Sequence, residues 1–214
     1  MAPSDVSATS LRGASPRLSE PAVVIIDSQP GFIQYMAGDP RPLELRLEKL
    51  VHLAERLELP VLATFEEPAV HGWLPDACEA LWPAGGLRHE KHTYDCCGGV
   101  EIADAIAALG RRQLLVAGAE TDVCVLQSVL SLLERNYEVF LLEDCLFSSE
   151  PNVGPALRRM YAAGVVPCTL KTAYYELMRD VRILRDPAAG GPRWERLLAD
   201  FGMPEEWLPW EPKL

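Results

Sequence analysis

Short apolar runs alternate with longer amphipathic runs along this chain, and this alternation constrains the fold more than any other feature. The short runs have the continuous apolar character of strands buried on both faces of a parallel sheet. They lie at 21–27, 61–65, 113–118, 138–144 and 165–170, and a further short strand is expected just before residue 91. The longer runs place their apolar residues on one helical face. They lie at 42–59, 100–110, 122–136 and 151–164, with a short helix at 76–81. Repeated strand–helix–strand units predict an α/β fold, a three-layer α/β/α sandwich around a mostly parallel, Rossmann-like sheet of about six strands.

The length and composition of the chain suit one domain. With 214 residues, 49% of them hydrophobic, the chain is long enough to bury a sizeable core. Residues 1–20 are polar and rich in Ser, Ala and Pro, which predicts a flexible N-terminal arm. Residues 21–185 hold the predicted sheet. Residues 186–214 are expected to form a C-terminal helix and tail that pack on this domain or on a neighbouring subunit.

The net charge of −11 argues against two classes of partner. Binding to a phosphate backbone needs a basic face, and an anionic membrane repels an acidic protein, so we expect neither a nucleic acid nor a membrane as partner. No apolar run approaches the ~20 residues of a membrane span, and the N-terminus lacks the apolar segment of a secretion signal. We therefore expect a cytoplasmic protein whose six cysteines are reduced.

Three polar residues, Asp27, Lys91 and Cys124, follow three different predicted strands. In sheets of this kind, ligands bind in the crevice beyond the carboxyl ends of the strands. Each residue also has an ordinary interpretation: Asp27 as a loop-capping carboxylate, Lys91 as a solvated surface lysine and Cys124 as an inert core residue. Three such groups at three strand ends nevertheless favour one shared site.

Cys124 lies in the first turn of the helix that follows the strand at 113–118. Thr121 or Asp122 can cap this helix. A helix N-terminus stabilises a thiolate and lowers its pKa, and its free N–H groups can bind an oxyanion. These features favour a reactive Cys124.

The segments around these residues match a known pattern. Asp27 in "VVIIDSQPGF", Lys91 in "EKHTYDCC" and Cys124 in "AGAETDVCV" resemble the Asp–Lys–Cys pattern of the isochorismatase-like cysteine hydrolase superfamily. The resemblance extends roughly over residues 20–175. Its most specific part is G-x-x-T-D-x-C-V, read here as Gly118, Thr121, Asp122, Cys124 and Val125.

The resemblance implies a mechanism and a set of site residues. Asp27 would be the general base, Cys124 the nucleophile that forms a thioester, and Lys91 an electrostatic and orienting group. A non-proline cis peptide would join Ala119 and Glu120. The backbone N–H groups of Glu120 and Cys124 would then form the oxyanion hole. Gln29 and Tyr94 are expected to bind substrate. Independently of the resemblance, Glu66 and Glu67 follow the second predicted strand, where they could bind a cationic or amino-bearing substrate or could equally form a solvated loop end.

Two features separate this chain from parts of the superfamily. Nicotinamidases carry a metal site with an Asp-x-His after the first strand, and this chain has no such pattern there, so we expect neither a metal nor another cofactor. Isochorismatases that cleave a vinyl ether lack the cysteine, so Cys124 favours C–N hydrolysis. Adjacent Cys96 and Cys97 are expected to be small residues facing opposite ways, with a redox role as the alternative.

The sequence therefore predicts a metal-independent hydrolase that cleaves a C–N bond, other than a peptide bond, of a small amide, carbamoyl or ureido substrate. The protein is expected to form a homo-oligomer, a dimer or larger. One alternative is a catalytically silent binding or assembly protein of the same family. Another is a thiol redox protein that uses Cys96 or Cys97, which the lack of a C-x-x-C disfavours.

Overall fold

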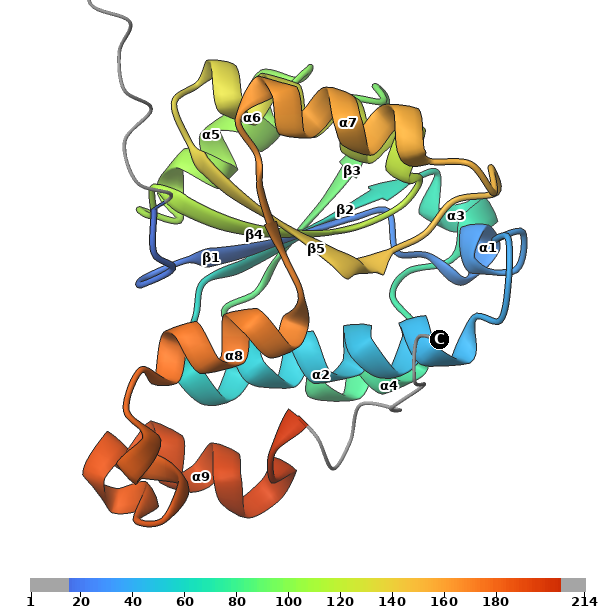
Figure 1. Cartoon of the computed structure of the whole chain (residues 1–214). Coiled ribbons are helices and arrows are strands. Elements are labelled where there is room, and N and C mark those ends of the chain that lie inside the picture. The colour runs from blue at the N-terminus through green and yellow to red at the C-terminus, as the bar shows by residue number, and fades with distance from the viewer. Residues whose placement is uncertain (1–15, 205–214) are drawn as a thin grey trace, which may run out of the picture.

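In the computed structural model, which describes residues 16–204, a six-stranded sheet forms the centre of the molecule (Figure 1). Its strands are β1 (Ala22–Ile26), β2 (Val61–Glu66), β3 (Leu87–Lys91), β4 (Gln113–Gly118), β5 (Glu138–Leu146) and β6 (Val166–Cys168). They lie in the order β3-β2-β1-β4-β5-β6, and every neighbouring pair is parallel. The predicted α/β fold with a Rossmann-like sheet is confirmed.

Helices cover both faces of the sheet and make the predicted three layers (Figure 1). One face carries α2 (Arg41–Leu57), α4 (Asp76–Leu81) and α8 (Leu170–Met178). The other carries α5 (Val100–Ala108), α6 (Leu126–Glu134) and α7 (Gly154–Ala163), while α9 (Pro192–Phe201) lies outside α2 and α8. Two 3₁₀ turns, η2 (Val181–Leu184) and η3 (Pro187–Gly190), precede α9. No helix between residues 16 and 204 is long and apolar enough to cross a membrane.

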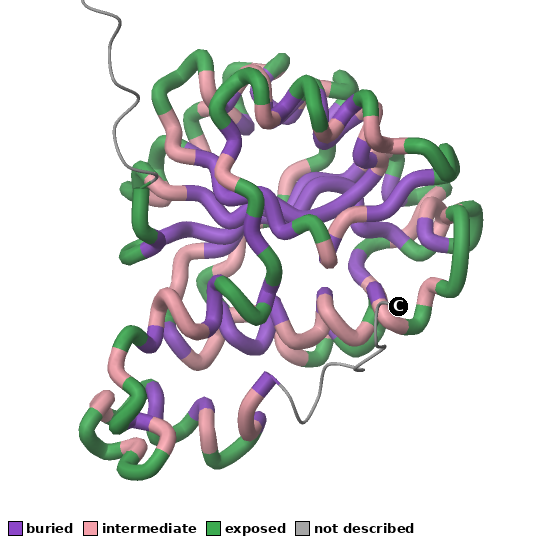
Figure 2. Tube along the Cα trace, in the orientation of Figure 1, coloured by how far each residue is buried: buried purple, intermediate pink, exposed green. Residues whose placement is uncertain are grey.

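Alternate residues of the strands feed two separate hydrophobic cores. In β1, Val23 and Ile25 pack in the core under α2, whereas Val24 and Ile26 pack in the core under α6. All four are at most 1% exposed, and Figure 2 shows the buried class running along the central strands of the sheet. Full burial of one such side chain contributes about 1.5–3 kcal/mol. This two-sided burial explains why β1 and β4 are continuous apolar runs, whereas the edge strand β3, with the sequence LRHEK, alternates.

Several element boundaries differ from the predicted ones for local reasons. The predicted helix at 122–136 begins with a π-helical turn, η1 (Thr121–Val125), before α6. The predicted strand at 165–170 stops early because the side chain of Thr169 accepts a hydrogen bond from the backbone N–H of Thr172 and caps α8. Two short proline-initiated helices, α1 (Pro30–Ile33) and α3 (Pro68–His71), follow β1 and β2 and were not predicted.

The two ends of the described chain pack against the domain. Leu18 is fully buried, and the side chain of Arg179 donates a hydrogen bond to its carbonyl oxygen at 2.9 Å. The end of the segment expected to be a flexible arm is therefore held against α8. At the other end, Phe201 of α9 packs edge-on against His52 of α2, with ring centroids 3.6 Å apart. The rest of the predicted arm and the tail at 205–214 lie outside the described residues.

The strand order reverses between β1 and β4, and a crevice is expected beyond the carboxyl ends of these two strands. Gly118 brings the ends of the strands together. Its φ is +127°, and a Cβ there would lie 1.9 Å from the carbonyl oxygen of Ile26. That same oxygen accepts a hydrogen bond from the backbone N–H of Ala119 at 2.8 Å. A glycine is required at this close approach.

Candidate active site

Asp27 lies immediately after β1, and its side chain points into the crevice with only 1% exposure. Its backbone adopts a left-handed conformation with φ of 44°, which Asp tolerates better than most residues. Thr64 of the neighbouring strand β2 holds it from two directions: the Thr64 hydroxyl donates to Oδ1 at 2.9 Å, and the Thr64 carbonyl accepts from the Asp27 N–H at 3.1 Å. Thr64 was not predicted, although a lone polar residue in the run VLATF is a usable signal.

Lys91 is the last residue of β3 rather than the residue after it, and it is 2% exposed. Its Nζ lies 2.7 Å from Asp27 Oδ2, 3.4 Å from Glu66 Oε2 and 3.5 Å from Cys124 Sγ. It also donates a hydrogen bond to the carbonyl oxygen of Thr93 at 3.0 Å. The ammonium is therefore at the centre of the three other groups, as a counter-charge for any anion that forms among them.

Cys124 lies in the π-helical turn η1 and is 6% exposed. Its Sγ and carboxylate oxygens of Asp27 and Glu66 all lie within 4.8 Å of one another. The structure thus brings together three residues that end or follow β1, β3 and β4, together with Glu66, the last residue of β2. A thiol, a carboxylate and an ammonium in this arrangement have the parts needed for nucleophilic catalysis.

Burial dominates the electrostatics of this group. Burial and the nearby Asp27 raise the pKa of the Cys124 thiol to about 12. Burial also raises the pKa of Asp27, although Lys91 offsets part of this effect. Burial alone would lower the pKa of Lys91, but the Asp27 carboxylate outweighs it and the pKa is raised. The Cys124 thiol is therefore protonated at neutral pH, and a base must accept its proton for the sulfur to attack.

The expectation that the helix N-terminus lowers the pKa of Cys124 was therefore wrong for the resting protein. The expected capping residues also act differently. Glu120 occupies the cap position and makes no side-chain cap. The hydroxyl of Thr121 donates to the carbonyl of Phe147 at 3.0 Å, and the Asp122 carboxylate accepts from Ser148 Oγ at 2.5 Å. Both side chains thus tie η1 to the end of β5.

The peptide bond between Ala119 and Glu120 is cis. Among the hydrogen bonds of residues 16–204, none is donated by the Glu120 backbone N–H. The side chain of Glu120 is engaged by the hydroxyl of Ser149, which donates to its Oε2 at 2.9 Å. The turn thus places a free backbone donor beside the thiol.

A pocket of about 120 Å³ opens onto the thiol. It is lined by Asp27, Phe32, Glu66, Tyr94, Ala119, Glu120, Val123 and Cys124. Of the three expected substrate-binding residues, Glu66 and Tyr94 line it and Gln29 does not. The buried Gln29 amide instead donates to the carbonyl oxygens of Glu66 at 3.0 Å and Gly72 at 2.6 Å, and accepts from the Glu66 N–H at 2.8 Å. Gln29 therefore positions the end of β2.

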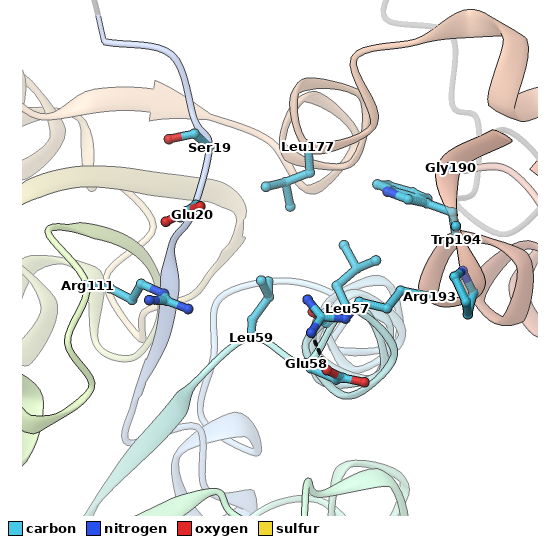
Figure 3. A pocket seen from close by; sticks show the side chains of 12 residues that line it. Ser19, Glu20, Leu57, Glu58, Leu59, Arg111, Leu177, Gly190, Arg193 and Trp194 are labelled. Carbon is cyan, nitrogen blue, oxygen red and sulfur yellow. Dashed lines mark hydrogen bonds and ion pairs between the residues drawn. The ribbon is translucent and has the colours of Figure 1, made fainter.

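A larger hollow of about 420 Å³ lies at the opposite edge of the sheet. Its walls come from residues that precede β1, β2 and β4, from the end of α2 and from the start of α9 (Figure 3). Arg193 pairs with Glu58 there, and Leu57, Leu177 and Trp194 supply apolar surface. Neither a cysteine nor a histidine is among the described residues that line it.

The site residues do not fit a metal ion. Among the described residues, the possible metal ligands in the pocket are the Cys124 thiol and the carboxylates of Asp27 and Glu66. The ammonium of Lys91 lies within 3.5 Å of an atom of each of them and supplies the positive charge that a metal would bring. No histidine is among the described residues that line the pocket. A cation added here would have to displace or neutralise Lys91.

The adjacent Cys96 and Cys97 do not face opposite ways as expected. Their sulfurs lie 3.8 Å apart, and both side chains are buried. They sit in a turn and not in a strand, so side chains need not alternate between faces. The Asp95 carboxylate accepts a hydrogen bond from the Cys97 N–H at 2.8 Å. The hydrogen bond from Cys96 lowers the pKa of Cys97, and the same contact, with burial, raises that of Cys96.

Comparison with known proteins places these features in a family. The model of the Isochorismatase domain matches residues 21–172, well over half of the chain. The probable hydrolase YcaC of Escherichia coli strain K12 is 28% identical over 167 residues, which are 77% of this chain and 80% of that protein.

Solved structures agree with this match. YcaC from Pseudomonas aeruginosa, solved with hexane-2,5-diol and covalent acrylamide, is 27% identical, with a TM-score of 0.74 over 87% of this chain and 98% of that one. YcaC from Escherichia coli, described as an octameric hydrolase of unknown specificity, is 25% identical, with a TM-score of 0.74 over 86% of this chain and 96% of that one. By the family model and by these relatives, this chain belongs to the isochorismatase family.

Proposed function

We propose that this protein is a cysteine hydrolase that cleaves a C–N bond, other than a peptide bond, in a small amide, carbamoyl or ureido compound. One observation carries the proposal: Lys91 Nζ joins Asp27 at 2.7 Å to Cys124 Sγ at 3.5 Å at the base of a pocket. A hydrolase role is supported by membership of the isochorismatase family and by the YcaC relatives.

In the first half of the proposed reaction, the thiol proton of Cys124 passes to the Asp27 carboxylate as sulfur attacks the carbonyl carbon. A pKa of about 12 leaves almost no thiolate at neutral pH, so this transfer must accompany attack. Negative charge that develops on the carbonyl oxygen is received by the backbone N–H groups of Glu120 and Cys124. The C–N bond breaks, the leaving amine takes the proton from Asp27, and a thioester remains.

In the second half, water attacks the thioester. Asp27 takes a proton from the water, and Cys124 leaves and is reprotonated, so that one amide and one water become one acid and one amine. Lys91 keeps Asp27 in place and balances its charge throughout. Because Lys91 stays protonated, its charge balances the negative charge of Asp27 before and after each proton transfer.

The experiment is a screen of small amides and ureides for ammonia release, combined with mass spectrometry of the protein. We expect an acyl adduct on Cys124 for at least one substrate, and no ammonia release by the Cys124→Ala variant. Acrylamide is a useful probe of thiol reactivity at Cys124, because the related YcaC from Pseudomonas aeruginosa was solved with covalently bound acrylamide. Cys97→Ala is the matched control, because it removes a buried thiol outside the pocket lining. Ammonia release that survives Cys124→Ala would exclude this mechanism.

We further propose that the protein acts as a homo-oligomer. The octameric YcaC from Escherichia coli supports this, as do the exposed side chains of Tyr35, Val70 and Trp73, which are 66%, 72% and 47% exposed. Size-exclusion chromatography with light scattering of the full chain tests the proposal. A monomer at micromolar concentration would contradict it.

A further inference from the structure

The pocket around Cys124 is acidic, and its described lining has no Lys, Arg or His. Asp27, Glu66 and Glu120 supply the charged groups, and the remaining residues are apolar or aromatic apart from the thiol. Among the described residues, Lys91 is the cation paired with this lining; it is 2% exposed and contacts both Asp27 and Glu66. One ammonium against the three carboxylates of the lining leaves the site with excess negative charge.

Glu66 is the carboxylate best placed to act on a substrate. Asp27 is 1% exposed and committed to Lys91, and the Glu120 side chain is engaged by Ser149. The Glu66 side chain is 28% exposed, and its Oε2 lies 3.4 Å from Lys91 Nζ and 3.9 Å from Cys124 Sγ. A group bonded to the carbon under attack must therefore pass close to Glu66.

Glu66 is also held firmly in this position. The side-chain amide of Gln29 bonds both the N–H and the carbonyl of Glu66, at 2.8 and 3.0 Å, and Gln29 is fully buried. A second hydrogen of the same amide is given to the carbonyl of Gly72 at 2.6 Å. The Gln29 amide therefore fixes the backbone of Glu66, and the contact of Oε2 with Lys91 Nζ at 3.4 Å directs its carboxylate toward the thiol.

We propose that Glu66 makes this pocket select by charge: it accepts small primary amides that are neutral or carry an ammonium group, and it rejects amides that carry a carboxylate. The inference rests on the proposed function, because it names the substrate class of the same site. The pocket of about 120 Å³ also suits a small substrate.

Iodoacetamide and iodoacetate test the charge selection without requiring turnover. Iodoacetamide carries a neutral amide where iodoacetate carries a carboxylate. The rate of each reagent with Cys124 is divided by the rate of the same reagent with a free small thiol, which corrects for their different intrinsic reactivity. We expect iodoacetamide to be favoured by at least about 100-fold, because like charges brought together in a pocket are strongly disfavoured. Glu66→Gln, which keeps the shape and removes the charge, should reduce this preference at least about tenfold.

Glu67→Gln is the matched control, because Glu67 is exposed, adjacent in sequence and outside the lining of the pocket. It should leave the preference unchanged within about twofold. Equal normalised rates for the two reagents would overturn the inference. An equal change of the preference in Glu66→Gln and Glu67→Gln would also overturn it, as would a Cys124 that neither reagent labels.

Turnover extends the test to three acetamides that carry a methyl, an ammonium or a carboxylate group: propionamide, glycinamide and malonamate. In Glu66→Gln the ratio of kcat/KM for malonamate to that for glycinamide should rise at least about tenfold. Charge-selective labelling without ammonia release from any amide would reject the proposed hydrolase and leave the charge selection standing. Hydrolysis of malonamate as fast as that of propionamide would reject the charge selection and leave the proposed hydrolase standing.

Discussion

The two edges of the sheet carry different side chains. The larger hollow lies at the amino ends of the strands, and the thiol with its ion pair lies at the carboxyl ends. The hollow before the strands has about 420 Å³ and is built from residues such as Leu59 and Arg111, which precede β2 and β4. The pocket beyond the strands has about 120 Å³ and holds the thiol with its ion pair. Pocket size therefore does not locate the site. Parallel strands do, because all their carboxyl ends meet at one edge.

The two edges also hold ion pairs of opposite kinds. Asp27 and Lys91 are each 1% exposed in their side chains, whereas Arg193 and Glu58 are 55% and 52% exposed. Breaking a buried pair leaves an uncompensated charge and costs about 3–5 kcal/mol, while an exposed pair contributes about 0–1 kcal/mol. The same type of contact is thus buried beside the candidate nucleophile at one edge and half-exposed at the other.

The largest expected effect comes from Asp27→Asn. The change keeps the shape of the side chain but removes the base, so kcat/KM for any amide substrate should fall by about 10³-fold, within the range known for general bases. Labelling of Cys124 by iodoacetamide should fall with it, because the thiol loses the carboxylate that is proposed to take its proton. Labelling of Cys97, whose pKa is lowered by Cys96, should not change. A variant that retains a tenth of the activity would remove Asp27 from the mechanism.

Lys91→Met tests the buried pair through stability. It leaves the Asp27 carboxylate without its counter-charge, and we expect a loss of about 3 kcal/mol in the free energy of unfolding by urea at pH 7. Without Lys91 the pKa of Asp27 rises further, so part of the loss should return as the pH falls and Asp27 takes up a proton. The double variant with Asp27→Asn should lose less than Lys91→Met alone. A loss below about 1 kcal/mol would mean that the pair behaves like a surface one.

The fold was readable from the sequence because its strands are buried on both faces. Runs such as 21–27 and 113–118 must be apolar throughout, and the helices between them keep an apolar stripe. The boundary errors arose at residues whose local hydrogen bonds compete with the pattern. Thr169 caps α8 where a strand was predicted, and Thr121 bonds Phe147 where a helix cap was predicted.

The composition of the site could be predicted from the strand ends, but its geometry could not. Asp27, Lys91 and Cys124 each follow a predicted strand, and the carboxyl ends of parallel strands meet at one edge of the sheet. This pattern does not reveal that Gln29 turns its amide away from the pocket to clamp Glu66, because that depends on how the ends of β1 and β2 meet. Nor does it show how deeply the thiol is buried. Burial, more than the helix N-terminus, sets the pKa of Cys124.

The pH dependence of kcat/KM tests the role of Asp27 without a mutation, and its expected effect is smaller. Asp27 must be ionised to take the thiol proton, and burial raises its pKa above the ordinary 3.8 despite Lys91. Activity should therefore fall about tenfold per pH unit once the pH drops below that raised pKa, with a midpoint clearly above 3.8. Because the pKa of Lys91 is raised above 10.5, its titration should not limit activity between pH 7 and pH 10. An acid midpoint at or below 3.8 would contradict the assignment of Asp27 as base.

The smallest effects are expected at the larger hollow. Arg193→Ala removes a half-exposed pair with Glu58 and a hydrogen bond to the carbonyl of Leu57 at 3.3 Å, and should cost at most about 1 kcal/mol of stability. That cost should shrink in high salt, which screens exposed pairs. Arg111→Ala removes another cation from the same hollow and serves as the control. Neither change should alter kcat/KM by more than about twofold, because neither residue lies near the carboxyl ends of the strands. A tenfold loss of activity in Arg193→Ala alone would show that the two edges are coupled through α2, the helix that connects β1 to β2 and carries Glu58 at its end.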